Sequence, residues 1–382
     1  MKKLISVFFI VLFLTPITIK ALDTDLTPNA SSSILIEFET GETIYEKNSH
    51  EKLHPASMTK IMSMLIIMEY IDNGSIKWDD TVTVSANASG MGGSQILLET
   101  NEKMSVYDLF KGIAVASGND AVVAMAEFIA GSEDAFVELM NKKAKQLNLS
   151  DTNFKNVHGL DDANHYSSAH DMAIMARELI KHEKVLEFTS IYEDYLRKGT
   201  DKEFWLVNTN KLVRFYDGAD GLKTGYTKEA GYCLTATAKK NDMRLIAVAM
   251  HEPDSKTRNE EVIALLDYGF AQNSIERILS KDKIIKKAKV DLGKIEEIEI
   301  VPTENITVLN KKNDKKNSPT FETKLNKLTA PLKVGDIVGT ITIEYNDTKR
   351  EVNLTVKNDV KKCNIFEAYL RNLKNIISGK LV

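Results

Sequence analysis

The hydrophobic and polar positions near the start of the chain predict a hairpin followed by a buried helix. Two β-rich runs, residues 33–38 and 43–46, flank a short polar turn, which is typical of a two-stranded hairpin. Pro55 then opens a helical stretch whose body, residues 61–68, is apolar nearly all round and which ends at Gly74. A helix that is apolar on every side belongs in the centre of a domain.

The middle of the chain mixes helical and strand patterns. Ser105, with Asp108 three residues later, resembles a capping box ahead of an apolar helix. Residues 121–130 have the small side chains of a closely packed helix. Residues 232–238 and 244–250 are strand-like and flank a polar turn, which indicates a second hairpin. The sequence therefore predicts a mixed domain of helices and antiparallel strands up to about residue 275.

Beyond about residue 275 the pattern changes to short apolar runs in a background of lysines and acids. The predicted strands are residues 290–292, 298–300, 306–308, 337–341 and 352–356. Residues 311–318 form a charged loop between them, and this region carries no catalytic constellation. We expect a small all-β domain that acts as a spacer or contacts other proteins.

The last residues have the pattern of an amphipathic helix. Its apolar residues recur at helical spacing, and they are Ile365, Phe366, Tyr369, Leu370, Leu373, Ile376 and Ile377. Arg371, Lys374 and Lys380 lie off this stripe, and the segment is too polar to span a bilayer. We expect residues 361–382 to lie in a membrane interface, with packing against the β domain as the alternative.

The first residues have the layout of a secretory signal peptide. Lys2 and Lys3 precede a short apolar run, and Ala21 offers a small residue for cleavage. We expect residues 1–21 to be removed and the protein to be exported, with an uncleaved amino-terminal anchor as the alternative.

Length, charge and cysteine content narrow the class of protein. A chain of 382 residues is long enough for two domains. Without residues 1–21 it has 47 basic and 54 acidic residues, a net charge of −7, so nucleic acid is not an expected partner. Its two cysteines, Cys233 and Cys363, fall in different predicted domains and make no disulfide framework. Cys233 lies in an apolar run, where we interpret it as a buried core residue.

Three short motifs follow one another in the predicted mixed domain. They are Ser-Met-Thr-Lys at residues 57–60, Ser-Gly-Asn at 117–119 and Lys-Thr-Gly at 223–225. Together they supply a nucleophilic hydroxyl, an amine that can take its proton, a second hydroxyl, an amide and a cation for an anionic substrate. This combination is typical of covalent acyl transfer. Each motif alone is weak, because residues 280–283 and 85–87 also satisfy the first two patterns.

The predicted local structure of these motifs fits that chemistry. Ser57 falls in the first turn of the apolar helix, where free N–H groups favour a developing alkoxide, and Lys60 follows on the same face. Lys60 can accept a proton only if burial or a nearby cation such as Lys223 lowers its pKa. Three plainer interpretations remain open, namely an exposed Lys60, a simple turn at residues 117–119 and a strand-edge role for Lys223. Gly225 leaves room for a substrate peptide to be added to its strand.

Longer stretches around the motifs give a family resemblance. HPASMTK at residues 54–60, ASGNDA at 116–121, VHGLD at 157–161 and DGLKTG at 220–225 are similar to the signatures of one family. Over residues 25–275 the chain resembles the serine-type D-alanyl-D-alanine carboxypeptidases, the low-molecular-weight penicillin-binding proteins of peptidase family S11. The resemblance implies an α/β (α+β) penicillin-binding or β-lactamase-like transpeptidase domain, with an antiparallel sheet and a helical subdomain.

With the patterns above, this gives a domain organisation for the whole chain. We expect a signal peptide at residues 1–21, a D,D-peptidase domain at 22–275, a small β-rich domain at 276–360 and the amphipathic helix at 361–382. The resemblance agrees with a peripheral position of the exported protein on the outer face of the cytoplasmic membrane.

The resemblance also implies roles for single residues. Ser57 would be the acylated nucleophile, Lys60 its general base, and Ser117 and Asn119 the proton relay and substrate clamp. The substrate would be held by Lys223 and Thr224, on the strand that continues through Gly225. The oxyanion hole would consist of the backbone N–H groups of Ser57 and Tyr226. Arg258 occupies the place of an arginine that contacts the substrate carboxylate, although it could also cap or brace the helix predicted at 259–270.

The resemblance implies removal of the terminal D-alanine from peptidoglycan stem pentapeptides, covalent binding of β-lactams, and no metal or cofactor. A β-lactamase-like hydrolase and a penicillin-binding module without turnover are the alternatives. The first is disfavoured because the loop 153–171 offers Asp161 and Asp162 but no glutamate motif for deacylation. A metal site formed by His158, His165 and His170 with Asp161 is a further alternative, but their spacing fits no zinc-peptidase pattern. The sequence leaves open whether an amine sometimes replaces water, and in which growth stage the enzyme acts.

Overall fold

A computed structural model describes residues 25–312, 318–345, 348–367 and 369. The predicted signal peptide, most of the charged loop at 311–318 and most of the amphipathic helix therefore lie outside the described residues. Within the described ranges, no helix has both the length and the apolar character needed to cross a bilayer.

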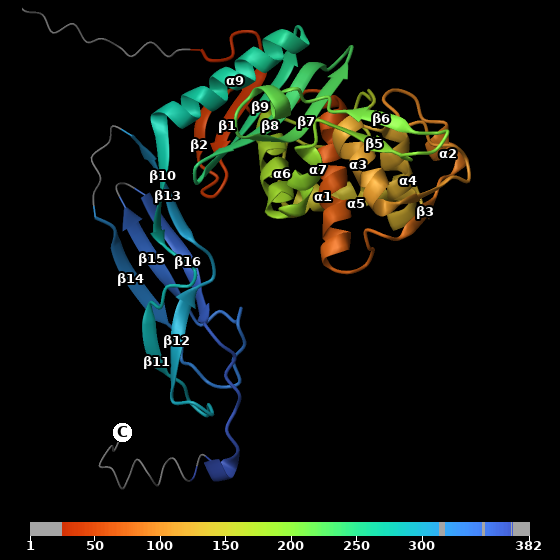
Figure 1. The fold of residues 1–382 in the computed structure, drawn as a ribbon. Coiled ribbons are helices and arrows are strands. Elements are labelled where there is room, and N and C mark those ends of the chain that lie inside the picture. Colours follow the sequence, from red (N-terminus) through yellow and green to blue (C-terminus); the bar gives the residue numbers. More distant parts are fainter. Residues whose placement is uncertain (1–24, 313–317, 346–347, 368, 370–382) are drawn as a thin grey trace, which may run out of the picture.

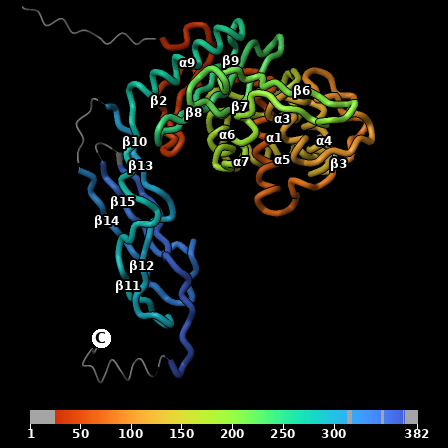
Figure 2. The backbone as a smooth tube through the Cα atoms, in the orientation of Figure 1, coloured from red at the N-terminus to blue at the C-terminus, as the bar shows by residue number. Residues whose placement is uncertain are grey.

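Two bodies are visible in the structure, a mixed α/β domain and an elongated β domain joined to it through α9 and β10 (Figures 1 and 2). The helical elements are η1 Ala56–Thr59, α1 Lys60–Asp72, α2 Ala86–Ser89, α3 Val106–Ala116, α4 Asn119–Ala130, α5 Glu133–Gln146, α6 Ala169–Lys181, α7 Lys184–Thr189, α8 Leu212–Phe215 and α9 Ser255–Gln272. The strands of the mixed domain are β1 Ser32–Glu37, β2 Thr43–Lys47, β3 Thr81–Thr83, β4 Lys103–Ser105, β5 Glu193–Leu196, β6 Phe204–Val207, β7 Ala219–Thr227, β8 Gly231–Lys240 and β9 Met243–Glu252.

The centre of the mixed domain is an antiparallel sheet in the order β2-β1-β9-β8-β7, in which β7 is an edge strand. The inner strands β1, β9 and β8 have buried side chains on both faces because helices cover both. Ile34 and Val248 belong to the core formed with α1, α3, α4 and α6, whereas Leu35 and Ala247 belong to the core under α9. This layering confirms the predicted sheet with a helical subdomain.

The predicted apolar helix is α1, and its residues from Lys60 to Met68 are all buried. It does not open as an α-helix, however. Residues Ala56–Thr59 form a 3₁₀ turn, η1, and α1 begins only at Lys60. The predicted helix start at Ser105 is confirmed, because Ser105 is the N-cap of α3 and its hydroxyl accepts a hydrogen bond from Asp108 N.

The β domain consists of a five-stranded sheet in the order β11-β12-β16-β15-β14 and a β10-β13 pair. Its strands are β10 Asn273–Leu279, β11 Lys286–Lys289, β12 Glu297–Pro302, β13 Ile306–Lys311, β14 Thr320–Leu325, β15 Gly339–Tyr345 and β16 Thr348–Val356. The boundary predicted at residues 275 and 276 falls inside β10, which pairs with β13. The strand predicted at 290–292 is wrong, because Leu292 has a φ of +56° and the chain turns there.

The two domains also touch away from the covalent connection. The Thr307 hydroxyl, on β13, donates a hydrogen bond to the carboxylate of Glu39 in the β1–β2 turn. Arg277, on β10, places its guanidinium 3.8 Å from the same carboxylate. The hairpin predicted from the first apolar runs therefore supplies part of the domain contact.

Candidate active site

The turn η1 brings Ser57 and Lys60 together. In a 3₁₀ helix the side chains of residues i and i+3 lie directly above one another. The Nζ atom of Lys60 is accordingly 3.0 Å from Ser57 Oγ. The geometry predicted for an α-helical first turn is therefore achieved by a tighter turn.

The amine of Lys60 is fully buried and has two further partners. Its Nζ lies 2.7 Å from Asn119 Oδ1 and 2.8 Å from the backbone carbonyl oxygen of His158. Burial lowers the pKa of Lys60 well below its ordinary value, and the positive charge of Lys223 lowers it further. Asp120 opposes this shift. The interpretation of Lys60 as an exposed lysine is wrong.

The second motif forms the junction between α3 and α4. Ser117 ends α3 with a φ of +64°, in the left-handed region, and Asn119 is the first residue of α4. The side chain of Asn119 accepts from Lys60 through Oδ1 and donates through Nδ2 to the carbonyl of Gly92, 2.7 Å away. The Ser117 hydroxyl is buried and has no hydrogen-bond partner in the described ranges. A turn is present, as the plain interpretation held, and it directs an amide onto Lys60.

The third motif lies on the edge strand β7. Lys223 is 1% exposed, and its Nζ donates to the carbonyl oxygen of Thr224 at 3.0 Å. Burial and the nearby charge of Arg258 lower the pKa of Lys223 to about 7. The Thr224 hydroxyl donates to the Thr209 hydroxyl at 2.7 Å. A buried lysine does not serve as a charged gatekeeper at a sheet edge, so the strand-edge interpretation of Lys223 is wrong.

Gly225 lets β7 approach the nucleophile. A Cβ atom at this position would lie 2.7 Å from the Pro55 carbonyl oxygen and 3.2 Å from the backbone nitrogen of Ser57. The space left by the missing side chain faces η1. Gly225 therefore allows close packing against η1, whereas the sequence suggested that it leaves room for a substrate. The next residue, Tyr226, is 56% exposed, and its ring contacts that of Tyr232 in a tilted arrangement at a centroid distance of 4.3 Å.

Arg258 lies in the first turn of α9, at the side of the sheet opposite to α1. It does not cap the helix, because Asp254 accepts the hydrogen bonds of Lys256 N and Thr257 N there. The Arg258 guanidinium is buried and donates to Asn259 Oδ1 at 2.9 and 3.2 Å. It acts on the pKa of Lys223, which places it near the third motif.

A loop over residues 157–165 completes the surroundings of Lys60, and sequence reasoning assigned it no catalytic part. Its His158 carbonyl receives the lysine amine, and Gly159 follows with a φ of +89°. His165 Nε2 lies 2.7 Å from the Thr59 hydroxyl. Burial lowers the pKa of His158 to about 3 and that of His165 to about 4. Both imidazoles are neutral at pH 7.

The histidines of this loop form hydrogen bonds with their own surroundings. Among the residues that the structure describes, no group of three or more His, Cys, Asp or Glu is arranged to hold a metal ion. Of the two cysteines, Cys233 is fully buried, as expected, and burial raises the pKa of its thiol to about 12.

Asp120 is a second residue of the site whose structural role sequence reasoning missed. Its buried carboxylate accepts hydrogen bonds from the backbone nitrogens of Ile96 and Leu98, each at 3.0 Å. The backbone nitrogen of Asn119 donates to the Ser94 carbonyl at 2.7 Å. The loop 91–98 is thus fixed beside the second motif. An acidic residue within an otherwise apolar helix start was the available signal.

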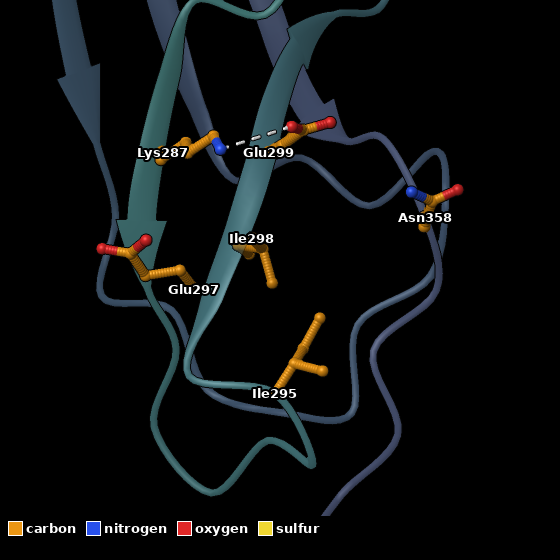
Figure 3. Close-up of a pocket in the computed structure, with 6 residues that line it drawn as sticks. All are labelled: Lys287, Ile295, Glu297, Ile298, Glu299 and Asn358. Atoms are coloured by element: carbon orange, nitrogen blue, oxygen red, sulfur yellow. Dashed lines mark ion pairs between the residues drawn. The ribbon is translucent and has the colours of Figure 1, made fainter.

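A separate pocket of about 330 Å³ lies in the β domain, at the end remote from the mixed domain (Figures 1 and 3). It is lined by Lys287, Ile295, Glu297, Ile298, Glu299 and Asn358. Lys287 and Glu299 form an ion pair with an N–O distance of 3.8 Å. These lining residues include no serine, cysteine or histidine, so the pocket offers no nucleophile and base comparable to Ser57 and Lys60.

Comparison with known protein families matches both domains. Residues 19–254 match the D-alanyl-D-alanine carboxypeptidase model of peptidase S11, and residues 275–362 match the C-terminal domain of penicillin-binding protein 5.

Individual proteins agree with the family models. The chain is 48% identical over 382 residues to the D-alanyl-D-alanine carboxypeptidase DacF of Bacillus subtilis, covering 98% of both chains. It is 35% identical to DacC of Escherichia coli over 88% of this chain and 86% of that one. Penicillin-binding protein 5 of Haemophilus influenzae superposes with a TM-score of 0.71 at 34% identity, covering 87% of this chain and 98% of that one.

A solved structure in an ampicillin-bound form also matches part of the chain. Penicillin-binding protein D2 of Listeria monocytogenes, in its ampicillin-bound form, superposes with a TM-score of 0.57 at 31% identity. The match covers 63% of this chain and 98% of that one.

Proposed function

Because the chain belongs to the peptidase S11 family of D-alanyl-D-alanine carboxypeptidases and acts in cell-wall metabolism, we propose that Ser57 and Lys60 carry out its acyl transfer. The substrate is a peptidoglycan stem pentapeptide that ends in D-alanyl-D-alanine. Ser57 Oγ attacks the carbonyl carbon of the penultimate D-alanine, and the terminal D-alanine leaves. The observation that carries the proposal is the 3.0 Å approach of a fully buried amine to the Ser57 hydroxyl.

The partners of Lys60 fit a neutral amine. A neutral lysine has two N–H donors and one lone pair, whereas an ammonium has three donors. The two carbonyl oxygens, Asn119 Oδ1 and His158 O, take the two donors. The lone pair is then directed at the Ser57 hydroxyl and accepts its proton as Oγ attacks. The burial and the Lys223 charge that lower the pKa of Lys60 support this role.

The proton then moves to the leaving amine. Ser117, whose buried hydroxyl has no partner in the described part of the chain, is proposed to pass it on. Cleavage of the C–N bond releases D-alanine as a free amine and leaves an ester on Ser57. Water then attacks the ester carbonyl and gives up a proton. The bond between the acyl carbon and Ser57 Oγ breaks, Ser57 recovers its hydroxyl hydrogen, and the peptide shortened by one D-alanine leaves as a carboxylate, so that the enzyme returns to its initial state.

We propose that the negative charge of the tetrahedral intermediate is stabilised by the N–H groups of Ser57 and Tyr226. The close approach of Gly225 to Ser57 N supports this assignment, since it brings β7 beside the amide of the nucleophile. Thr224, Lys223 and Arg258 are proposed to hold the terminal carboxylate, and Asn119 the substrate amide. As an edge strand, β7 is free to receive the peptide as an added strand.

Covalent binding of β-lactams follows from the same chemistry, because the strained lactam amide presents its carbonyl to Ser57 in place of the peptide. A β-lactamase-like activity is not favoured by the comparisons, in which the relatives are carboxypeptidases. A binding module without turnover is likewise not favoured.

We further propose that the enzyme is exported and rests on the outer face of the cytoplasmic membrane. Support comes from the sequence pattern of residues 1–21 and from the first turn of the terminal helix. There Ile365, Phe366 and Tyr369 are 90%, 70% and 62% exposed, so these apolar side chains are available to a lipid surface. Flotation of the mature protein with anionic liposomes, against a form truncated at Asp359, tests this proposal. If neither form floats with the liposomes, the proposal is wrong.

The central test of the proposed chemistry is mass spectrometry after exposure to penicillin. We expect one covalent adduct, on a peptide that contains Ser57, and release of D-alanine from an acyl-D-Ala-D-Ala peptide. Ser57→Ala should lose both signals and keep its melting temperature within a few degrees, because one hydroxyl contributes little to the core. Ser280→Ala, in the second Ser-x-x-Lys sequence, is the matched control and should behave as wild type. Undiminished labelling of Ser57→Ala refutes the assignment.

A further inference from the structure

The residue before the nucleophile has an unfavourable backbone conformation. Ala56 is the first residue of η1 and is 1% exposed, with a φ of +46°. This left-handed region costs an alanine free energy, because its Cβ atom crowds the backbone. Such a conformation persists only where the surrounding structure holds it. The contacts that hold Ala56 therefore also fix the position of Ser57.

Two glycines from different parts of the chain pack against Ala56. In the loop 157–165, a Cβ atom at Gly159 would lie 1.8 Å from the Ala56 carbonyl oxygen. On β7, a Cβ atom at Gly225 would lie 3.1 Å from Ala56 Cβ and 2.7 Å from the Pro55 carbonyl oxygen. Both backbones thus approach η1 more closely than a side chain would allow. The loop and the strand are two walls that enclose the turn.

A hydrogen bond joins these two walls, two residues beyond each glycine. Thr227, the last residue of β7, donates from Oγ1 to Asp161 Oδ1 at 2.6 Å. The same hydroxyl oxygen accepts a hydrogen bond from Ala230 N at 3.0 Å, which orients it within the turn between β7 and β8. The loop and the strand are therefore connected directly as well as through η1.

The side chain of Asn156 connects Asp161 to Gly159 within the loop. Its Oδ1 accepts a hydrogen bond from Gly159 N at 2.7 Å, and its Nδ2 donates to the Leu160 carbonyl oxygen at 2.9 Å. These bonds fix the turn that carries Gly159, and Asp161 follows it directly in the chain. A restraint on Asp161 is therefore also a restraint on Gly159 and on its contact with Ala56.

We propose that Asp161 and Thr227 are positioning residues, whose hydrogen bond keeps the loop and β7 closed around η1. Without this bond the two walls can separate, and Ala56 can relax toward a conformation with negative φ. Relaxation of Ala56 moves Ser57 Oγ away from Lys60 Nζ, which lies 3.0 Å from it in the closed arrangement. This inference deepens the proposed function, and it rests on the assignment of Ser57 as the acylated nucleophile.

The effect should appear in the rate of acylation and hardly in stability. Asp161 is exposed and Thr227 is half-buried, and substitutions at such positions change the melting temperature by a few degrees at most. Loss of one hydrogen bond should lower the population with Ser57 in place, and hence the acylation rate, about tenfold. Penicillin and peptide react with the same hydroxyl, so the loss should be equal for both.

The test follows two reactions of the intact mature enzyme, labelling by excess fluorescent penicillin and release of D-alanine from an acyl-D-Ala-D-Ala peptide. Asp161→Ala and Thr227→Val should each slow both reactions about tenfold and leave the final extent of labelling unchanged. The double variant should be no slower than Thr227→Val alone, because both substitutions remove the same hydrogen bond. Thr227→Ser keeps the hydroxyl and should follow wild type. Asp162→Ala, which removes the neighbouring exposed carboxylate, is the matched control.

Substitution of Ala56 separates positioning of the turn from a general effect on the loop. Glycine adopts a positive φ without the cost that alanine has, so the turn in Ala56→Gly depends less on the two walls. In the Ala56→Gly background, Asp161→Ala should therefore change the labelling rate by less than about twofold. An equal tenfold loss in both backgrounds overturns the inference.

Labelling of Asp161→Ala and Thr227→Val at the wild-type rate also overturns it. So does a loss confined to the peptide, which would mean that Asp161 contacts the stem peptide itself. A lower final extent of labelling at an unchanged rate would show unfolded enzyme and has the same consequence. In these cases penicillin still labels Ser57 of the wild type, so the proposed function stands. Absence of labelling at Ser57 in the wild type would instead refute the proposed function.

Discussion

Substitution of Gly159 by alanine should test how tightly the loop 157–165 controls the catalytic lysine. Gly159 has a φ of +89°, and a Cβ atom there would lie 1.8 Å from the carbonyl oxygen of Ala56. It would also lie 2.9 Å from the Thr59 hydroxyl. The loop or the nucleophile turn η1 must therefore move by more than an ångström, since nonbonded carbon and oxygen atoms keep more than 3 Å apart in practice.

The cost has two parts that can be separated. The left-handed conformation costs an alanine about 1 to 2 kcal/mol. Relief of the collision in a packed site adds about 1 to 3 kcal/mol. Together these give about 2 to 5 kcal/mol, which lowers the melting temperature by about 4 to 20 °C for a domain of this size.

Catalysis should suffer more than stability. Movement of the loop takes the His158 carbonyl, 2.8 Å from Lys60 Nζ, out of contact. A displacement of about 1 Å in a catalytic constellation lowers rates by about 10²-fold. We therefore expect acylation by a fluorescent penicillin to slow about 100-fold in Gly159→Ala, measured with enzyme in excess so that one turnover is followed.

Gly74→Ala is the matched control. Gly74 has a φ of +78°, but a Cβ atom there meets no heavy atom within 4 Å. The Gly74→Ala enzyme should therefore lose only the stability that the left-handed conformation costs, and penicillin should acylate it at the wild-type rate. If Gly159→Ala matches Gly74→Ala in both melting temperature and acylation rate, the proposed role of the loop is wrong.

Three further predictions concern charge and loop position. Lys223→Ala should slow acylation at least about tenfold. It should also move the acidic side of the pH dependence of kcat to higher pH, because removal of a nearby cation raises the pKa of Lys60. An unchanged pH dependence contradicts this prediction. Because burial lowers the pKa of His165 from 6.5 to about 4, its neutral imidazole contributes about 3 kcal/mol to the free energy of unfolding above pH 6.5, and this contribution should be lost as the pH falls through 4. Urea unfolding of wild type and His165→Gln across this pH range measures the loss. Asp120→Asn should weaken the hold on the loop 91–98, with faster amide hydrogen exchange there and a higher KM; unchanged exchange refutes it.

The sequence contained enough local information to predict the main elements of the mixed domain. A hairpin, a capping box and an all-apolar helix depend on residues a few positions apart, and these patterns correspond to β1, β2, α1 and α3. The three motifs could be placed on a helix start, a helix junction and a strand for the same reason. Their convergence required the fold, because Lys60, Asn119 and Lys223 are far apart in the chain.

Other features depend on backbone geometry that residue types do not specify. Every residue has a backbone carbonyl oxygen, so no side-chain pattern marks that of His158 as the acceptor for Lys60. The opening of the nucleophile helix as a 3₁₀ turn follows from the close packing of η1 against Gly159 and Gly225. In the β domain, the apolar residues 290–292 had the composition of a strand, but Leu292 lies in a left-handed turn.

The electrostatic arrangement explains why the catalytic amine can remain neutral in a site designed for an anion. Arg258 lowers the pKa of Lys223, and Lys223 lowers the pKa of Lys60. Each cation therefore makes the next one easier to deprotonate. Asp120 opposes the shift at Lys60, but it is the smallest of the three influences on that pKa, and its carboxylate also accepts hydrogen bonds from the backbone N–H groups of Ile96 and Leu98. Positive charge therefore remains for the substrate where Lys60 must lose its own.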